Sequence, residues 1–479
     1  MKRLIQPKAL LIWLTLAGSA NAASGETLIV GGPDAQFQSV QGAIAAARAG
    51  DRIEVRGGVY EGNIVLDKRL TLEGVTVEGV GRPVLRGAGR GSVVVVTADG
   101  CVVRGFRIEH SGGDLTREDS AILLKSGNNQ VEDNELGDVL YGIYLLGSSG
   151  NTLGRNVIRG RSELESGERG AGLHLWNSHG NTIEENVISF MRDGMYIQNC
   201  TDNRILRNRV FDLRYGLHYM NSDRNVFEDN FFTNNVAGAA IMYSNKIELR
   251  RNAFIRNRGF SSFGILFQDC NDLLAEENFI IDNATGIFIE SLRRSVLRRN
   301  VIAENDVAIQ MFSSADANVF TENNFVANLS LLQLVGRGST TKWALDGRGN
   351  FWSNYDGYDL DGDGTGDVAH KVQNVFEHME GNYPRLRIYL NSPAAQALAV
   401  AEKSFPVLRG TSEADASPLT RAVDLNFPFE RERPTLRAQL SLVAISLVMI
   451  GLALVVMWKG QRRARMNSDR NESAMIRLE

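Results

Sequence analysis

The sequence contains little of several residue types that mark common protein classes. Of its 479 residues only three are cysteine and nine are proline, and the net charge is −4. Three cysteines cannot form the dense disulfide framework of a small secreted domain. So small a net charge does not indicate nucleic-acid binding. The Gly-rich stretch at 362–367 lies in an acidic run and lacks the lysine of a phosphate-binding loop.

Glycine, in contrast, is abundant, with 48 residues, and it marks a repeat of about 22 residues in the middle of the chain. The glycines that open successive repeats are Gly142, Gly172, Gly194, Gly216, Gly238, Gly264 and Gly286. Each is the first residue of an apolar stretch such as GLHLW. A second stretch, with asparagine at both ends as in NTIEEN, follows it. A unit of this size cannot bury its own apolar face, so neighbouring units must stack into a solenoid.

The repeat predicts a parallel β-helix. Asparagine recurs at one point of the repeat, where it tolerates left-handed backbone and where stacked side chains can bond along the axis. These positions are Asn134, Asn156, Asn186, Asn208, Asn230, Asn252, Asn278 and Asn300. A leucine-rich repeat has a similar period, but its helix-forming half and its leucine spacing are absent. We therefore expect an all-β solenoid, with loops inserted at corners where two repeats are longer.

The solenoid domain is predicted to span residues 23–390. Regular repeats cover about 120–330, and residues 340–390, rich in Trp, Tyr and Asp, are expected to form a C-terminal cap. Phe37, Val40, Ile44 and Ala47 share one face of a short amphipathic helix that ends at Gly50. This helix is expected to cap the N-terminal end of the solenoid.

The two ends of the chain predict export and membrane anchoring. Residues 1–22 combine two basic residues, an apolar run and an A-x-A site, as in a secretory signal peptide. A linker is predicted at 391–436. The uncharged apolar segment at 439–458 is long enough to form a transmembrane helix. The basic residues that open the tail at 459–479 indicate a cytoplasmic tail and a periplasmic solenoid anchored in the inner membrane.

The alternation of side chains along a strand places some residues of each repeat outside. Residues one and three after the glycine face the interior, and residues two and four after it face outward. The outward set contains His218 and Met220 on one strand and Met242 on the next rung. Thioether sulfur and imidazole suit copper, so these three residues are candidate copper ligands, with His174 as a further candidate. Alternatively, they coat a surface that another protein covers.

Other sulfur-containing residues are assigned to the interior. Met195 and Met311 fall on inward positions. Cys200 and Cys270 occupy the position that is serine in most repeats, and we expect a ladder of small residues there. The two cysteines lie three rungs apart, which is too far for a disulfide.

A second candidate metal site lies in the acidic segment near the end of the solenoid. Asp359, Asp361, Asp363 and Asp367 have the spacing of a calcium loop, and Gly-rich backbone permits the sharp turn. The twelfth position, where an EF-hand has glutamate, is His370. Calcium or a similar hard cation is therefore predicted, and an acidic surface turn is the alternative.

Enzyme chemistry is the main alternative to metal binding, because many β-helices act on polysaccharides. Hydrolysis needs paired carboxylates, and elimination or epimerisation needs a base near a cation. Glu290 has no neighbouring carboxylate on the outer face, and Asp193, Arg192 and Arg214 fall at corners. We find no acid–base pair and expect that the protein is not an enzyme. A polysaccharide lyase, a C5-epimerase and a metal-free docking scaffold stay open as alternatives.

The residues above resemble those of the NosD family, the periplasmic maturation factors of nitrous oxide reductase. The repeats, the stretch RYGLHYMNS at 214–222 and the segment at 349–370 (GNFWSNYDGYDLDGDGTGDVAH) carry the resemblance, which covers about residues 25–390. It implies a right-handed parallel β-helix. It also implies an ABC-type ATPase and permease, a lipoprotein copper chaperone and nitrous oxide reductase as partners.

The resemblance and the outward-facing residues together predict a function. We expect the protein to accept Cu(I) transiently from the chaperone and to deliver it for assembly of the copper–sulfide centre of the reductase. The resemblance suggests this task, and it does not specify the ligands. The membrane segment of this chain departs from the soluble proteins expected in this family.

Overall fold

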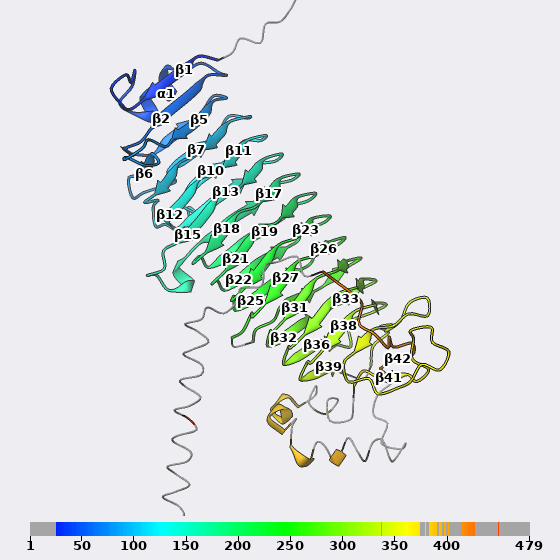
Figure 1. The fold of residues 1–479 in the computed structure, drawn as a ribbon. Coiled ribbons are helices and arrows are strands. Elements are labelled where there is room, and N and C mark those ends of the chain that lie inside the picture. Colours follow the sequence, from blue (N-terminus) through cyan, green and yellow to red (C-terminus); the bar gives the residue numbers. More distant parts are fainter. Residues whose placement is uncertain are drawn as a thin grey trace, which may run out of the picture. The chain divides into compact units, whose positions relative to one another are not determined.

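In the computed structural model, three long parallel sheets surround one apolar core (Figure 1). The structure describes residues 25–426, except 260, 337, 374–378, 380–382, 390–391, 395–396, 399–400 and 402–412, and residue 449 beyond them. Among these residues, sheets A and B have 13 strands each and sheet C has 12. Sheet A runs from β1 (Thr27–Val30) to β37 (Val319–Thr321), and sheet B from β3 (Val59–Glu61) to β40 (Phe351–Trp352).

Sheet C holds the candidate copper ligands. In chain order its strands are β4 (Ile64–Leu66), β7 (Val94–Val96), β10 (Ser120–Leu124), β13 (Tyr141–Leu146), β16 (Ala171–Trp176), β19 (Asp193–Gln198), β22 (Tyr215–Met220), β25 (Ala237–Met242), β28 (Ile265–Gln268), β32 (Thr285–Ile289), β36 (Val307–Phe312) and β39 (Ser330–Val335). Each strand pairs in parallel with its equivalent one turn later. This arrangement confirms the predicted parallel β-helix.

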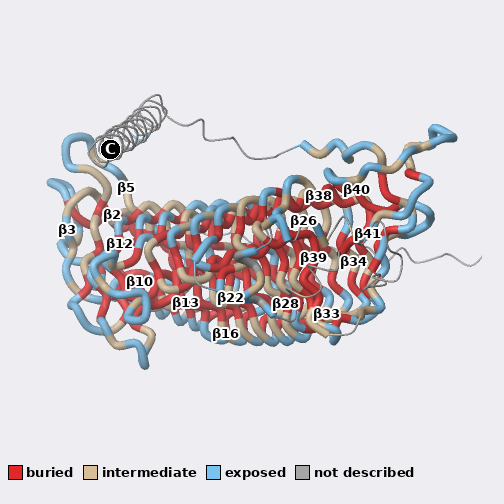
Figure 2. Tube along the Cα trace, turned by 90° about the horizontal axis from the view of Figure 1, so that it is seen from below, coloured by how far each residue is buried: buried red, intermediate tan, exposed pale blue. Residues whose placement is uncertain are grey.

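The predicted alternation of side chains is confirmed along sheet C. The inward residues have almost no exposed surface, and they include Leu173, Leu175, Met195, Ile197, Leu217, Tyr219, Ile241, Ile265, Phe267, Ile287 and Ile289. Met311 is also buried, as expected. Figure 2 shows buried positions, in red, recurring along the whole length of the solenoid.

The glycine that opens each repeat is required by close packing between turns. A Cβ atom added at Gly194 would lie 2.6 Å from the carbonyl oxygen of Gly216, and one at Gly216 would lie 2.6 Å from that of Gly238. No side chain fits between backbones this close. The sequence repeat therefore reflects a line of close backbone contacts along the axis.

Asparagine side chains form hydrogen-bonded ladders along the axis. The Nδ2 of Asn208 donates to the Oδ1 of Asn230 at 2.9 Å, and Asn230 donates in the same way to Asn252 at 2.9 Å. The predicted ladder is thereby confirmed. Two more ladders were not predicted, and they run through Asn129, Asn151, Asn181, Asn203 and Asn225, and through Asn235, Asn257, Asn283, Asn305 and Asn328.

One corner of the solenoid carries charges that alternate in sign from turn to turn. The residues have left-handed backbone, with φ between 51° and 57°, and are Asp133, Arg155, Glu185, Arg207, Asp229, Arg251, Glu277, Arg299 and Glu322. Each arginine donates a hydrogen bond to an acidic residue of the preceding turn. For example, Arg207 Nε donates to Glu185 Oε1 at 3.1 Å. Every charge therefore has opposite charges as neighbours along the axis.

The N-terminal helix is shorter than predicted. Helix α1 (Val40–Ala46) begins after Ser39, whose Oγ accepts a hydrogen bond from the Gly42 N–H at 3.1 Å. Phe37 precedes the helix, because its backbone forms a bridge with Val30. The helix buries Val40, Ala43 and Ile44 against the first strands. Its role as a cap stays a prediction.

Residues 413–423, which lie within the predicted linker at 391–436, pack against the end of the solenoid. Strand β42 (Ala414–Asp415) pairs with β41 (His370–Lys371), and Glu413 and Asp415 are buried. Glu413 accepts a hydrogen bond from the Trp343 indole at 2.8 Å. The linker is predicted from the Ala, Pro and charged composition of this segment. Composition does not reveal that a carboxylate will meet a buried indole from an earlier part of the chain. A short 3-10 helix, η2 (Pro384–Tyr389), lies between these segments.

The predicted signal peptide at 1–22, transmembrane helix at 439–458 and tail at 459–479 lie outside the described residues, apart from residue 449. Within the part of the chain that the structure describes, no helix combines the length and the apolar character needed to cross a bilayer.

Candidate functional site

The outward residues of sheet C come together in three neighbouring strands. Met220 on β22 pairs with Met242 on β25, and His218 pairs with Tyr196 on one side and Ala240 on the other. Neighbouring strands lie about 4.8 Å apart, so the two thioethers start from adjacent backbone positions on the same face. All three candidate ligands are half-buried. The register thus places the predicted ligands next to one another.

His218 is held by an acidic residue that the sequence did not reveal as a partner. Its Nδ1 lies 3.3 Å from Oδ2 of Asp193, which has no exposed surface. Arg214 donates to both oxygens of the same carboxylate, at 3.0 and 2.8 Å. Arg192 Nε lies 3.5 Å from Asp193 Oδ2. The corner residues Asp193, Arg192 and Arg214 therefore belong to the same cluster as His218.

Asp193 is negatively charged at neutral pH. Burial alone would raise its pKa, but hydrogen bonds and charges from His218 and Arg214 outweigh burial and lower the pKa below its usual value. An ionised carboxylate only accepts hydrogen bonds. The His218 nitrogen that faces this carboxylate, Nδ1, therefore carries a proton and donates to it.

Aromatic rings surround the two histidines of this face. His174 stacks on Tyr144, with ring centroids 4.4 Å apart, and meets the Tyr196 ring edge-on at 4.9 Å. Tyr196 also meets His218 edge-on at 4.8 Å, and Tyr215 lies 5.2 Å from His218. Tyr196 therefore lies between the two imidazoles. Each of these tyrosines is unremarkable in the sequence, and only the strand register reveals the stack.

His174 differs from His218 in its surroundings. It is 5% exposed, and neither of its ring nitrogens has a hydrogen-bond partner. Burial lowers its pKa to about 4, so the ring is neutral at pH 7. Glu118 Oε1 lies 3.4 Å from Nδ1 but outside hydrogen-bond geometry. Tyr196 therefore separates the ring of His174 from that of His218.

The three cysteines of the chain are not suited to bind copper. Cys101, Cys200 and Cys270 are buried and unpaired, as expected for Cys200 and Cys270. Burial raises the pKa of Cys200 to about 11 and that of Cys270 to about 12. The thiolate is the form that binds metal, so both side chains are poor ligands at neutral pH.

The acidic loop is only partly assembled as predicted. Carboxylate oxygens of Asp359, Asp361 and Asp363 lie within 4.8 Å of one another. Asp367 is outside this group, and its Oδ2 accepts the Leu360 N–H at 2.7 Å. His370, at the position of the EF-hand glutamate, is half-buried and stacks on the Trp352 ring at 4.9 Å; it is not part of the carboxylate group.

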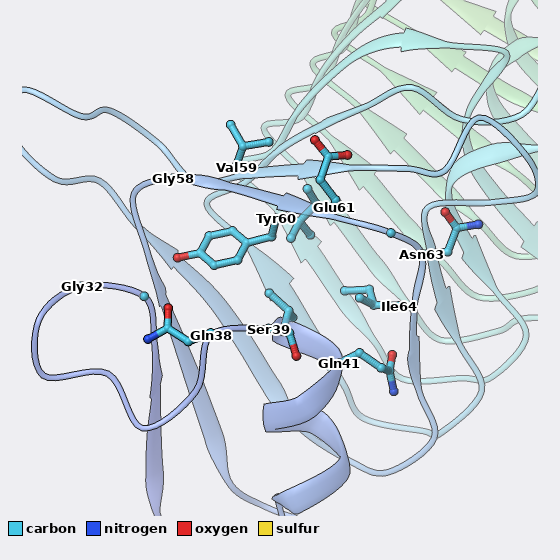
Figure 3. Close-up of a pocket in the computed structure, with 14 residues that line it drawn as sticks. Gly32, Gln38, Ser39, Gln41, Gly58, Val59, Tyr60, Glu61, Asn63 and Ile64 are labelled. Carbon is cyan, nitrogen blue, oxygen red and sulfur yellow. The ribbon is translucent and has the colours of Figure 1, made fainter.

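A separate cleft of about 390 Å³ lies at the N-terminal end, beside α1 and β3 (Figure 3). Three of its polar side chains have hydrogen-bond partners within the protein. Tyr60 donates to the Arg56 carbonyl at 2.8 Å, and Gln41 accepts the Val65 N–H at 2.9 Å. Asn63 accepts the Ala88 N–H at 2.9 Å. This cleft is formed by the first turns and shares no residue with the histidine cluster.

The fold and the cluster together define a parallel β-helix that presents histidine, methionine and aromatic side chains on one outer face. Comparison with known proteins identifies the family: the chain belongs to the NosD family. The family model described as periplasmic copper-binding protein (NosD) matches residues 154–357.

Two relatives cover most of the chain. A probable ABC transporter binding protein NosD of Pseudomonas aeruginosa is 31% identical over 426 residues, covering 85% of this chain and 97% of that protein. A protein of the same name from Stutzerimonas stutzeri is 27% identical over 402 residues, covering 80% and 90%. The relatives are named as binding proteins rather than as enzymes.

Solved structures with a similar fold include a polysaccharide-modifying enzyme. The A-module of the mannuronan C-5 epimerase AlgE6 of Azotobacter vinelandii superposes with a TM-score of 0.52 at 14% sequence identity. The match covers 64% of this chain and 92% of that one. At this identity the likeness shows the fold alone.

Proposed function

We propose that the protein accepts Cu(I) from a copper chaperone and delivers it for assembly of the copper–sulfide centre of nitrous oxide reductase, together with an ABC transporter. The binding residues are His218, Met220 and Met242. Membership in a periplasmic copper-binding family supports the metal. The relatives' name, ABC transporter binding protein, supports the transporter.

The pairing of Met220 with Met242 beside His218 is the observation that carries this proposal. Two thioethers and one imidazole form a soft donor set that favours Cu(I) over hard cations. The three side chains keep partial access to solvent. A three-coordinate exposed site suits transfer, because an incoming donor can bind before the first ligands leave.

Membrane attachment is part of the same proposal. The relatives' family is described as periplasmic, and we propose that the segment at 439–458 holds the solenoid at the inner membrane. Cell fractionation of the full chain and of a variant that ends at residue 426 tests the anchor. If the segment is an anchor, only the full chain sediments with membranes.

Titration with Cu(I) under reducing conditions tests the copper site. The full chain should bind copper, and the variant His218→Ala/Met220→Ala/Met242→Ala should bind it at least tenfold more weakly. Gln268, which follows Met242 in the same outward row, provides the matched control Gln268→Ala. Equal affinity in the triple variant and the wild type would refute the assignment. Absence of copper binding in the wild type would favour a docking scaffold.

One observation favours a second candidate function, a polysaccharide lyase or C5-epimerase. Asp193, Arg214, His218 and Tyr196 form an outer cluster of acid, cation, imidazole and phenol, which the sequence did not reveal. Such groups can abstract a proton next to a carboxylate. Turnover of an anionic uronate polymer, lost in His218→Ala, would support this candidate and count against the copper carrier.

The acidic loop is a separate proposal. We propose that Asp359, Asp361 and Asp363 bind Ca²⁺ weakly, because their oxygens are close together while Asp367 points elsewhere. Calcium should raise the melting temperature of the wild type and not that of Asp361→Asn/Asp363→Asn. An equal response of both proteins would refute this site.

A further inference from the structure

Asp193, the first residue of β19 in sheet C, is a fully buried carboxylate. Its carboxylate has no exposed surface, yet it contacts the half-buried His218 on the next strand. Arg214 holds both of its oxygens, and Arg192 adds a third basic side chain. This cluster fixes the carboxylate in one orientation, with Oδ2 directed to Nδ1 of His218.

The ring of His218 is restrained from other sides as well. Tyr196 meets it at an interplanar angle of 89° and Tyr215 at 61°. These contacts limit the tilt of the ring, but an aromatic ring does not choose which nitrogen carries the proton. The carboxylate makes this choice, because it can only accept a hydrogen bond, and the nitrogen that faces it must therefore carry the proton.

We propose that Asp193 is a positioning residue that keeps His218 protonated on Nδ1 and so presents the Nε2 lone pair to copper. This inference rests on the proposed function. Metal-binding histidines gain basicity and a fixed orientation when the second nitrogen donates to a carboxylate. The two arginines act on copper only through Asp193, by holding its charge and its direction.

Copper affinity gives the first test. Asp193→Asn keeps the shape of the side chain but removes its charge. It should bind Cu(I) about 10- to 100-fold more weakly than the wild type, at unchanged stoichiometry. Asp272→Asn is a matched control, because Asp272 also accepts two bonds from one arginine, Arg294, at 2.8 and 3.1 Å. An equal loss in both variants would overturn the proposal.

The tautomer of His218 gives a second test, one that requires neither copper nor a substituted carboxylate. Nitrogen-15 NMR of the full chain, with the resonance assigned from His218→Ala, should show Nδ1 protonated and Nε2 unprotonated. A ring protonated on Nε2 in the wild type overturns the proposal even if Asp193→Asn fails to fold.

The two proposals fail in different ways. If His218→Ala binds copper as tightly as the wild type, the copper site is wrong, whatever the tautomer. If His218→Ala loses copper while Asp193→Asn keeps wild-type affinity and a folded structure, the copper site stands and the role of Asp193 is refuted.

Discussion

The indole Nε1 of Trp352 donates a hydrogen bond of 2.9 Å to Oδ2 of Asp415, which lies 63 residues later in the chain. The same carboxylate oxygen accepts the backbone N–H of Asn350 at 2.7 Å. Asp415 has no exposed surface. One side chain from a returning segment thus satisfies buried donors at the C-terminal end of the solenoid.

Removing Asp415 should therefore destabilise this end. Asp415→Ala leaves at least two buried N–H groups without an acceptor, at a cost of about 1–3 kcal/mol each. We expect a lower melting temperature. Tryptophan fluorescence should report the change best, because Trp352 loses its hydrogen-bond acceptor. Asp424→Ala, at an exposed position of the same segment, is the control and should leave the melting temperature unchanged. Equal stability of the two variants would show that the returning segment contributes little.

The asparagine ladder should be sensitive to loss of a single rung. Asn230→Ala removes the acceptor for the amide of Asn208 and the donor for the carbonyl of Ile205. Because both sites are fully buried, the free energy of unfolding should fall by about 2–4 kcal/mol. Chemical denaturation measures the change. Asn354→Ala, at an exposed position, should change it by less than about 0.5 kcal/mol.

Reversing one charge at the alternating corner should also destabilise the protein, though by less. Arg207→Glu would place a third carboxylate between Glu185 and Asp229, where all three follow one another along the axis. Exposed pairs are weak, so we expect a loss of about 1 kcal/mol that is larger at low salt. A loss independent of salt would contradict an electrostatic origin.

The cysteines should be dispensable for copper binding. The variant Cys101→Ser/Cys200→Ser/Cys270→Ser should keep wild-type Cu(I) affinity, because burial raises the pKa of all three thiols and disfavours the thiolate. A thiol reagent should react with the unfolded chain and only slowly with the folded protein. Loss of copper binding in this variant would show that sulfur ligands other than methionine are used.

Acid should destabilise the C-terminal end through His370. Burial lowers its pKa from 6.5 to about 4, so folding disfavours the protonated ring. The free energy of unfolding therefore has its full value above pH 6.5. It falls as the pH drops toward 4, because the unfolded chain binds a proton that the folded protein does not. The loss between pH 7 and 5 should be about 2 kcal/mol. His370→Phe keeps a ring on Trp352 and should flatten stability over this range, as measured by denaturation at each pH.

The sequence alone determined the architecture. The repeated glycine, the alternation of side chains and the recurring asparagine predict the parallel β-helix, the inward set of apolar residues and one ladder. These features are local and periodic, so each repeat carries the same information about its neighbours. The outward placement of His218, Met220 and Met242 follows from the same period.

The tertiary structure decided which groups share a site. Asp193 and Arg214 fall at corners in the sequence, and only the register of β19 and β22 brings them to His218. Glu413 and Asp415 lie in the segment that the sequence predicts as a linker. Only the tertiary structure shows that they accept hydrogen bonds from Trp343 and Trp352. The physical reason is the same in both cases. The free energy of a buried charge depends on its partners in other turns or in distant segments, and no local sequence pattern identifies those partners.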